Sequence, residues 1–213
     1  MNAPLFFPVF YSNLESRKIL EIYPKASFIT LDNLTDGQAR TCLYAKEIIN
    51  TGEELLIAGC DNGMLFSEST FAQEKLKADV LVFTYRNNEG VLKNPNAHGW
   101  VRVDGSNRIT GLSIKKSISD NPINDHAIVA TFWFRCGKIF VKAAEEMIAA
   151  NDKVNGEFYV DQAVAYILSA GYLVKVFEID RYIGWGTPED YELYQNTYIY
   201  WRDFRKSEHY LGE

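Results

Sequence analysis

The sequence predicts an α/β fold built on a doubly wound, mostly parallel sheet with mixed strand directions. In the first 85 residues, short apolar runs typical of strands alternate with segments of helical periodicity. That alternation is the pattern of parallel β-α-β units. After residue 85 the alternation gives way to a β-hairpin pattern and then to further helices, so we expect a mixed second half.

The first half supplies the alternating elements. Strands are expected at residues 6–11, 27–31, 55–60 and 79–85. Helices are expected at residues 14–23 and 35–50, with a third ending at 71–77. The run 55–60 is almost continuously apolar, which predicts a strand buried on both faces.

The second half begins with a hairpin, in which residues 98–103 and 109–114 flank the turn Asp104-Gly105-Ser106-Asn107. Further elements are expected at 127–134 (strand), 140–150 and 160–170 (helices) and 172–179 (strand). A last helix begins at Thr187-Pro188-Glu189-Asp190, where Thr187 suits the N-cap, Pro188 the first helical position and Asp190 a variant capping box. We expect the aromatic residues of the tail, 194–210, to cover the core rather than a partner.

Length and composition favour one large domain, residues 1–213, because 47% of the 213 residues are hydrophobic and no linker interrupts the chain. There is no apolar stretch of membrane-spanning length and no basic segment at the start, so we expect a cytoplasmic protein without a membrane partner. Its three scattered cysteines fit neither a disulfide framework nor a metal site. A net charge of -6 without a basic run argues against nucleic acid as a partner.

The stretch Leu55-Leu56-Ile57-Ala58-Gly59-Cys60-Asp61-Asn62-Gly63 carries an apolar strand into a glycine-flanked turn. In open α/β sheets ligands bind beyond the carboxyl ends of strands, where Asp61 is expected. A carboxylate there suits Mg²⁺, which takes one or two protein carboxylates together with substrate phosphates. The alternative is an ordinary turn, since Asp, Asn and Gly all favour turns.

Three further stretches hold candidate binding residues. Gly37-Gln38-Ala39 opens a helix, where glycine permits close backbone approach and Gln38 can pair with a base edge; the alternative is a plain helix start. Lys115 follows the hairpin and could offset a phosphate charge, or it could be a solvated lysine. Glu157 and Asp161 lie four residues apart around a helix start, where they could share a face and hold sugar hydroxyls or a metal, or could simply favour the helix N-terminus.

The order of these stretches resembles the sugar-1-phosphate nucleotidyltransferases, also called nucleotide-sugar pyrophosphorylases. The resemblance runs from "DNLTDGQARTCLYA" through "LLIAGCDNGM", "HGWVRVDGSNRITGLSIKK" and "NGEFYVDQAV" to "GWGTPEDYELY", and covers roughly residues 6–195, leaving 196–213 as a C-terminal tail. It implies a Rossmann-like nucleotide-diphospho-sugar transferase fold. It also implies transfer of a nucleoside monophosphate from an NTP to a sugar-1-phosphate, with pyrophosphate release, for the synthesis of polysaccharides or surface glycans.

The resemblance also implies residue roles. Asp61 would be catalytic as the Mg²⁺ ligand, and Lys115 would hold the sugar phosphate. Gly37, Gln38, Ala39 and Asn62 would contact the nucleotide, and Gly99, Glu157 and Asp161 the sugar. The expected partners are therefore the two small-molecule substrates, and a homo-oligomer is left open.

Two departures from the family pattern stand out. The family's glycine-rich loop with a basic residue and Lys-Pro is absent, since the first glycine is Gly37, so the chain is expected to begin at the family's second strand. A second metal-binding Asp of many relatives is replaced by Gly184. The alternatives are an inactive homologue or fragment that binds a nucleotide sugar and, against the order of motifs, a glycosyltransferase.

Overall fold

The computed structural model describes residues 6–10 and 21–206. The predicted strands at 6–11 and 27–31 are confirmed as β1 (Phe6–Phe10) and β2 (Ser27–Leu31), which pair in parallel as a separate two-stranded sheet. The helix expected at 14–23 lies largely outside the described residues.

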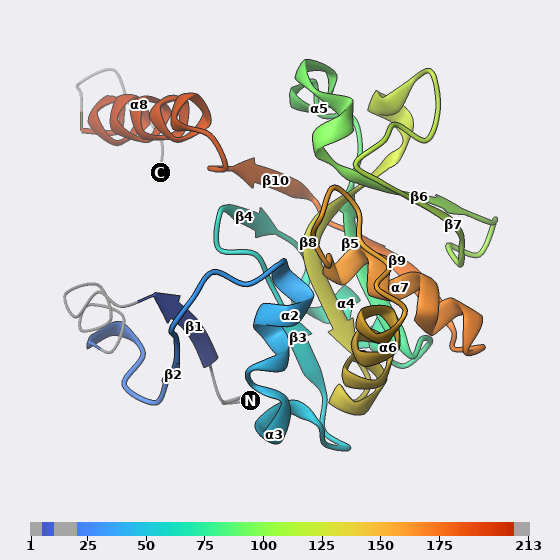
Figure 1. The fold of residues 1–213 in the computed structure, drawn as a ribbon. Helices are drawn as coiled ribbons and strands as arrows, with labels where there is room; N and C mark the ends of the chain where they lie inside the picture. Colours follow the sequence, from blue (N-terminus) through green and yellow to red (C-terminus); the bar gives the residue numbers. More distant parts are fainter. Residues whose placement is uncertain (1–5, 11–20, 207–213) are drawn as a thin grey trace.

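A six-stranded sheet forms the centre of the molecule (Figure 1). Its strands are β3 (Leu55–Ile57), β5 (Val80–Tyr85), β6 (Gly99–Val103), β7 (Ile109–Ile114), β8 (His126–Phe134) and β9 (Val174–Glu178). The pairings make β3, β5, β6 and β9 run in one direction and β7 and β8 in the other. The mixed α/β fold and the predicted hairpin, β6–β7, are confirmed. The antiparallel β8 separates β3 from β5, so consecutive parallel strands are not neighbours.

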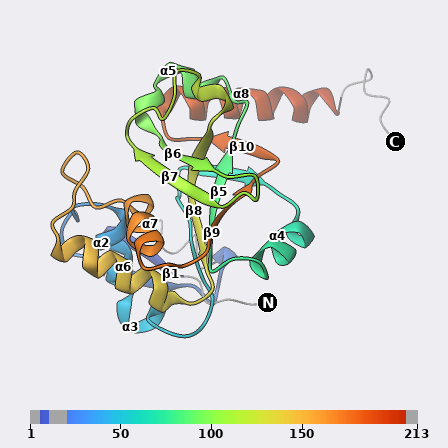
Figure 2. The same ribbon diagram turned by 90° about the vertical axis from the view of Figure 1, so that its right-hand side faces the viewer.

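Both faces of this sheet are covered, as a doubly wound arrangement requires (Figure 2). One face carries α2 (Gln38–Leu43), α3 (Lys46–Ile49), α6 (Gly137–Ala149) and α7 (Val160–Ser169). The other carries α4 (Glu68–Lys75) and a ribbon of β4 (Asn62–Leu65) and β10 (Arg181–Gly184). Alternate residues of β5 serve the two sides, with Val80 and Val82 in one cluster and Leu81 and Phe83 in the other.

Short helices complete the connections around the hairpin. They are α5 (Gly90–Lys93) and the 3₁₀ turns Pro95–Ala97 and Pro122–Asn124. The helix predicted at 35–50 is two helices, α2 and α3, because the chain makes a tight turn at Tyr44–Ala45 in which the Ala45 N–H donates to the Cys42 carbonyl at 3.0 Å.

The prediction that residues 55–60 form a strand buried on both faces was wrong. β3 is only three residues long, and the Leu56 side chain is 54% exposed. Among the described residues β3 pairs with β8 alone, so its other edge is unpaired. A continuous apolar run was therefore read as a central strand where the fold has an edge strand.

The last helix, α8 (Pro188–Phe204), starts as predicted, because the Asp190 N–H donates to the Thr187 hydroxyl at 3.1 Å. The expectation that its aromatic residues cover the core was wrong. No described residue of α8 is buried, and the helix extends away from the central sheet (Figure 1). No described helix is long and apolar enough to cross a lipid bilayer.

Candidate active site

Asp61 lies in the turn between β3 and β4, with its carboxylate exposed. Its Oδ1 accepts a hydrogen bond from the side-chain nitrogen of Asn62, Nδ2, at 3.2 Å. Its main-chain carbonyl accepts one from the backbone N–H of Trp185 at 2.8 Å. The turn is thus tied to the chain that leaves β10. Asp61, the acid that the sequence predicted after the strand, is held in place, and its carboxylate is open to solvent.

A local distortion of β8 lies where this strand contacts the Asp61 turn. Ala130 has a φ of 61°, unusual for a residue with a side chain, and the β5–β8 register shifts between Val82 and Thr84. The Ala130 carbonyl accepts from the Gly59 N–H at 3.0 Å, and the Val129 carbonyl accepts from the Asn62 amide at 3.1 Å. The irregular strand therefore supplies two carbonyls to the Asp61 turn.

Glycines leave the surroundings of Asp61 uncrowded. A Cβ on Gly186 would lie 3.4 Å from Asp61 Oδ2, and one on Gly63 would lie 2.9 Å from the Trp185 ring. A Cβ on Gly184 would lie 3.2 Å from the Tyr182 ring. The two glycines that flank Trp185, which helix capping leaves unexplained, therefore stand where side chains would meet Asp61 or Tyr182.

The segment Gly37-Gln38-Ala39, where α2 begins, is fixed to the stretch before α7. The Ala39 N–H donates to the Phe158 carbonyl at 3.0 Å, and the Phe158 N–H donates to the Asp36 carbonyl at 2.8 Å. A Cβ on Gly37 would lie 2.4 Å from the Phe158 carbonyl oxygen, and Gly37 has a φ of 123°. Only glycine fits this contact, and Gln38 is left exposed at the start of α2.

Charged groups surround the buried Phe158 ring. The Lys153 ammonium lies 4.8 Å and the Arg40 guanidinium 5.1 Å from the ring centroid, both within cation–π range. Asp36 pairs with both cations, and its hydrogen bond with Lys153 is the main cause that lowers its pKa. Sequence reasoning missed this cluster, because residues 36, 40, 153 and 158 follow no shared spacing.

Gly99, Lys115 and Asp161 come together at the other side of the site. A Cβ on Gly99 would lie only 2.3 Å from Asp161 Oδ2, so the carboxyl group packs directly on the Gly99 backbone. Lys115, with a φ of 55°, donates from its backbone N–H to the His98 carbonyl at 3.0 Å and from Nζ to the Ala97 carbonyl at 2.6 Å. Burial raises the Asp161 pKa to about 6, and the Lys115 charge acts in the opposite direction.

Tyr159 links this group to Glu157. The Lys115 ammonium lies 5.2 Å from the Tyr159 ring centroid. Burial and then a hydrogen bond with Glu157 raise the Tyr159 pKa to about 12, so the phenol stays neutral. The expectation that Glu157 and Asp161 share a helix face was wrong, because α7 begins at Val160 and Glu157 precedes it. The sequence analysis did not identify Tyr159 as a contact of Lys115. Its position between the candidate acids Glu157 and Asp161 was the one signal in the sequence that pointed to it.

Two tyrosines and a histidine line the region between the hairpin and β10. Tyr85 stacks on Tyr182 with ring centroids 4.2 Å apart, and its hydroxyl lies 3.5 Å from His98 Nδ1. Burial and then the Lys115 charge lower the His98 pKa, which favours a neutral ring at pH 7. Burial and then the Asp61 charge raise the Tyr182 pKa, so the phenol remains a donor.

Both halves of the candidate site meet β8 along three consecutive residues. The Asp61 turn uses the carbonyls of Val129 and Ala130, while a Cβ on Gly99 would lie 3.0 Å from Ile128 Cδ1. The predicted residues therefore fall into two groups that β8 connects: Asp61 and Asn62 in one, and Gly99, Lys115, Glu157 and Asp161 in the other. Phe158 joins the Gln38 segment to the second group.

At the Asp61 turn, the side chains that could hold a metal ion are those of Asp61 and Asn62. In the described part of the chain, no three His, Cys, Asp or Glu side chains lie close enough to share a metal ion. Asp61 is exposed, and the Asn62 Oδ1 beside it is buried without a partner among described residues. This donor set fits a Mg²⁺ ion that draws its other ligands from phosphates and water.

Comparison with solved structures finds proteins of similar fold. The nucleoside-diphosphate-sugar pyrophosphorylase from Vibrio cholerae superposes with a TM-score of 0.72 at 17% identity, over 92% of this chain and 81% of that one. A UDP-glucose pyrophosphorylase complexed with UDP-glucose gives 0.65 at 14% identity, over 92% and 81%. HddC from Yersinia pseudotuberculosis complexed with GMP-PN gives 0.60 at 13% identity, over 91% and 77%.

The chain has the fold of the nucleotide-sugar pyrophosphorylases. The fold that the ordered motifs implied is therefore confirmed. No protein-family model and no curated protein sequence matches the chain.

Proposed function

We propose that this protein is a sugar-1-phosphate nucleotidyltransferase that makes a nucleotide sugar for glycan synthesis. The observation that carries the proposal is that the turn holding Asp61 and the Gly99 backbone, which leads from the Lys115 hairpin, contact neighbouring residues of β8, Ile128 to Ala130, in a fold similar to that of the pyrophosphorylases. The charges suit two phosphate-bearing substrates, one bound through a cation at Asp61 and one beside Lys115.

The reaction in this proposal is a displacement at phosphorus. An oxygen of the sugar phosphate forms a bond to the α-phosphorus of the NTP, while the bond to the leaving pyrophosphate breaks. A Mg²⁺ ion on Asp61 would neutralise phosphate charge. Lys115 would orient the attacking phosphate and offset its charge, because such catalysis consists mainly of positioning and electrostatic stabilisation.

Other residues would position the two substrates. Gln38 is exposed at the start of α2 and is held there by the contacts of Gly37 and Ala39 with Phe158, which suits contact of this helix start with a base. Asn62 would orient Asp61 and contact the nucleotide, and Gly99 would let the backbone approach the sugar. Glu157 and Asp161 would accept hydrogen bonds from sugar hydroxyls.

The test is pyrophosphate release from each common NTP with glucose-1-phosphate or mannose-1-phosphate, in the presence of Mg²⁺. We expect release for at least one pair and a loss of about 100-fold or more in Asp61→Asn. The matched control is Asp180→Asn, because Asp180 lies at the far end of the β4–β10 ribbon, where its N–H donates to the Leu65 carbonyl. Equal rates in the two variants would contradict the role of Asp61.

A second candidate is binding of a nucleotide sugar without turnover. One observation favours it: residues 1–36 contain no glycine, so this sequence shows no glycine-rich phosphate loop before Gly37. It predicts Mg²⁺-dependent binding of UDP-glucose or another nucleotide sugar, weakened by Asp61→Asn, with no pyrophosphate release above a protein-free control. Transfer from a nucleotide sugar to an acceptor would instead indicate a glycosyltransferase.

A further inference from the structure

Lys115 carries a positive charge that no ion pair among the described residues neutralises. Four cations of the described chain lie over aromatic rings: Arg40, Lys75, Lys115 and Lys153. The other three also pair with a carboxylate, in the pairs Arg40–Asp36, Lys75–Glu54 and Lys153–Asp36. The ion pairs of the described residues do not include Lys115, although its charge acts on Asp161 through space. The Lys115 charge is therefore available to a bound anion.

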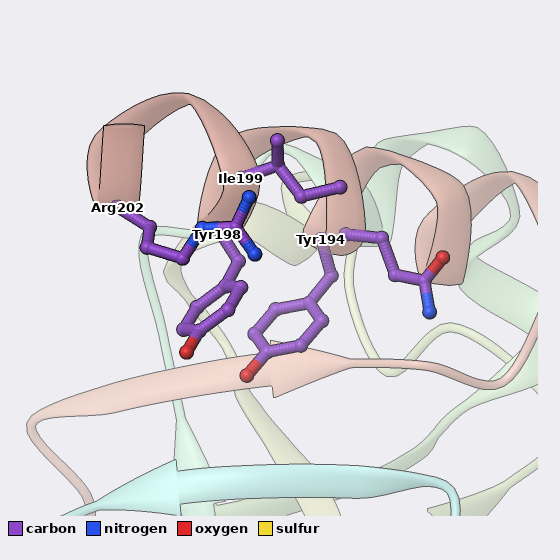
Figure 3. Close-up of a pocket in the computed structure, with 5 residues that line it drawn as sticks. Tyr194, Tyr198, Ile199 and Arg202 are labelled. Carbon is purple, nitrogen blue, oxygen red and sulfur yellow. The ribbon is translucent and has the colours of Figure 1, made fainter. Parts of the chain in front are cut away.

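A cation on α8 follows the common arrangement instead. Figure 3 shows Arg202 on the same helix as Tyr194 and Tyr198, and the three side chains help to line a hollow. The Arg202 guanidinium pairs with the neighbouring Asp203 at 2.9 Å. A cation that lies near aromatic rings in the described chain thus has an acidic partner as well, and Lys115 is the exception.

Lys115 is nevertheless held in place. Its φ of 55° lies in the left-handed region, and its backbone N–H donates to the His98 carbonyl at 3.0 Å. Its Nζ donates to the Ala97 carbonyl at 2.6 Å and lies 5.2 Å from the centroid of the Tyr159 ring. An ammonium group has three N–H donors. Since Ala97 uses one of them and the ring faces the group from another side, a donor remains for one further acceptor.

Tyr159 is suited to keep the ammonium there. It is the N-cap residue of α7 and lies between Phe158 and Val160, each only 1% exposed. Its hydroxyl is hydrogen-bonded with Glu157. Tyr159 belongs to neither core cluster, nor to the partly buried hydrophobic side chains that pack against them. The ring is thus fixed by its neighbours in the chain, and filling the core does not account for it.

We propose that Tyr159 is a positioning residue, whose ring and the Ala97 carbonyl together hold the Lys115 ammonium ready to bind one oxygen of a sugar phosphate. The inference rests on the proposed function for the identity of the anion. A lysine that is held in advance loses less rotamer entropy when it binds a ligand than a free lysine does. Tyr159 acts through Lys115 and needs no contact with the substrate.

Calorimetric titration with glucose-1-phosphate and with mannose-1-phosphate tests the proposal, both alone and with Mg²⁺ and an α,β-methylene NTP analogue that cannot react. Tyr159→Leu should weaken binding about 5-fold, because it removes the cation–ring contact. Tyr159→Phe keeps the ring and loses only the hydroxyl, so it should bind within about 2-fold of the wild-type chain. The matched control is Tyr166→Leu, which should leave the affinity unchanged. Tyr166 lies on α7 and its hydroxyl also donates to an acid, Asp152, at 3.0 Å.

A double-mutant cycle separates positioning from a merely structural role. Lys115→Met should weaken binding about 10-fold or more, because a hydrogen bond from a charged donor is lost. Adding Tyr159→Leu to Lys115→Met should then change the affinity by no more than about 2-fold, since Tyr159 has nothing left to position. Tyr159→Met is a second non-aromatic variant, and urea unfolding establishes that each variant is folded.

Three results would overturn the proposal: equal affinity of Tyr159→Leu and the wild-type chain, a full additional loss in the Lys115→Met background, or a wild-type chain that binds neither sugar phosphate. Failure of the proposed function gives a different result. Binding that depends on Tyr159, without pyrophosphate release from any NTP, would support the role of Tyr159 and contradict the enzymatic activity.

Discussion

Gly37 is the residue whose replacement the structure penalises most clearly. Its φ is 123°, and an added Cβ would lie 2.4 Å and 2.5 Å from the Phe158 carbonyl oxygen and nitrogen, both backbone atoms. Gly37→Ala should therefore lower the free energy of unfolding by about 2 kcal/mol or more, measured by urea denaturation. Gly105→Ala is the control, because nothing lies within 4 Å of its Cβ position. Similar losses in both variants would contradict the Gly37–Phe158 contact.

Asp161 makes stability depend on pH. Burial raises its pKa from 3.8 to about 6, so the folded chain retains a proton that the unfolded chain releases. Stability from this group is therefore present below about pH 4 and is lost as pH rises to about 6. Each pKa unit corresponds to about 1.4 kcal/mol. Asp161→Asn cannot ionise and should gain about 3 kcal/mol relative to the wild-type chain between these pH values.

The measurement is urea unfolding of both chains at a series of pH values from 4 to 7.5. Only the difference between the two chains is compared, because His98 and His126, whose pKa values burial lowers, titrate in both. A difference that stays flat across this range would mean that the Asp161 carboxyl is well solvated in the folded chain.

At the level of single residues, the sequence could identify candidates whose role depends on their neighbours in the chain. Asp61 follows an apolar run and Gly37 opens a helix, and both patterns are visible in one dimension. Ala130 could not be found this way, since nothing about an alanine between Val129 and Thr131 indicates a φ of 61°. Its conformation depends on the β5–β8 register and on the turn that β8 supports.

At the scale of elements, the caps of α4 and α8 offer a matched pair. The Ser67 hydroxyl accepts from the Thr70 N–H at 3.2 Å, and the Thr187 hydroxyl from the Asp190 N–H at 3.1 Å. Removal of either cap should cost its helix about 1 kcal/mol. Phe71 of α4 packs on the core, whereas α8 buries no residue.

Ser67→Ala should therefore lower the midpoint of global urea unfolding, because opening α4 exposes core. Thr187→Ala should leave that midpoint almost unchanged and instead speed hydrogen exchange of the α8 amides. Equal shifts of the global midpoint would contradict the independence of α8 from the core.

The errors in predicting elements arose because the sequence of a single strand or helix does not show which other elements pack against it. The apolar composition of residues 55–60 is typical of a central strand, but β3 has only β8 beside it among described strands. The sequence of α8 correctly predicts a helix, and its aromatic side chains were expected to form a face that packs on the core. Periodicity shows that such a face needs cover, and it cannot show whether the cover is the same chain or another.

At the scale of the whole molecule, the alternation of strands and helices was enough to predict a mixed α/β fold, because each element must bury its apolar face against another layer. The strand order was not accessible in the same way. β8 comes after the hairpin in sequence yet lies between β3 and β5 in the sheet. In that position it contacts both halves of the candidate site.

The separation of α8 from the layered body leads to the last prediction. A chain ending at Thr187 should unfold in one cooperative transition, because it keeps both core clusters and loses only edge contacts such as Tyr194 with Trp185. For a protein of this size, a loss of 1 kcal/mol lowers Tm by about 2–4 °C, so we expect a change no larger than that at low concentration.

Differential scanning calorimetry of the full and shortened chains measures this difference. If the shortened chain loses its cooperative transition, α8 is part of the folding unit.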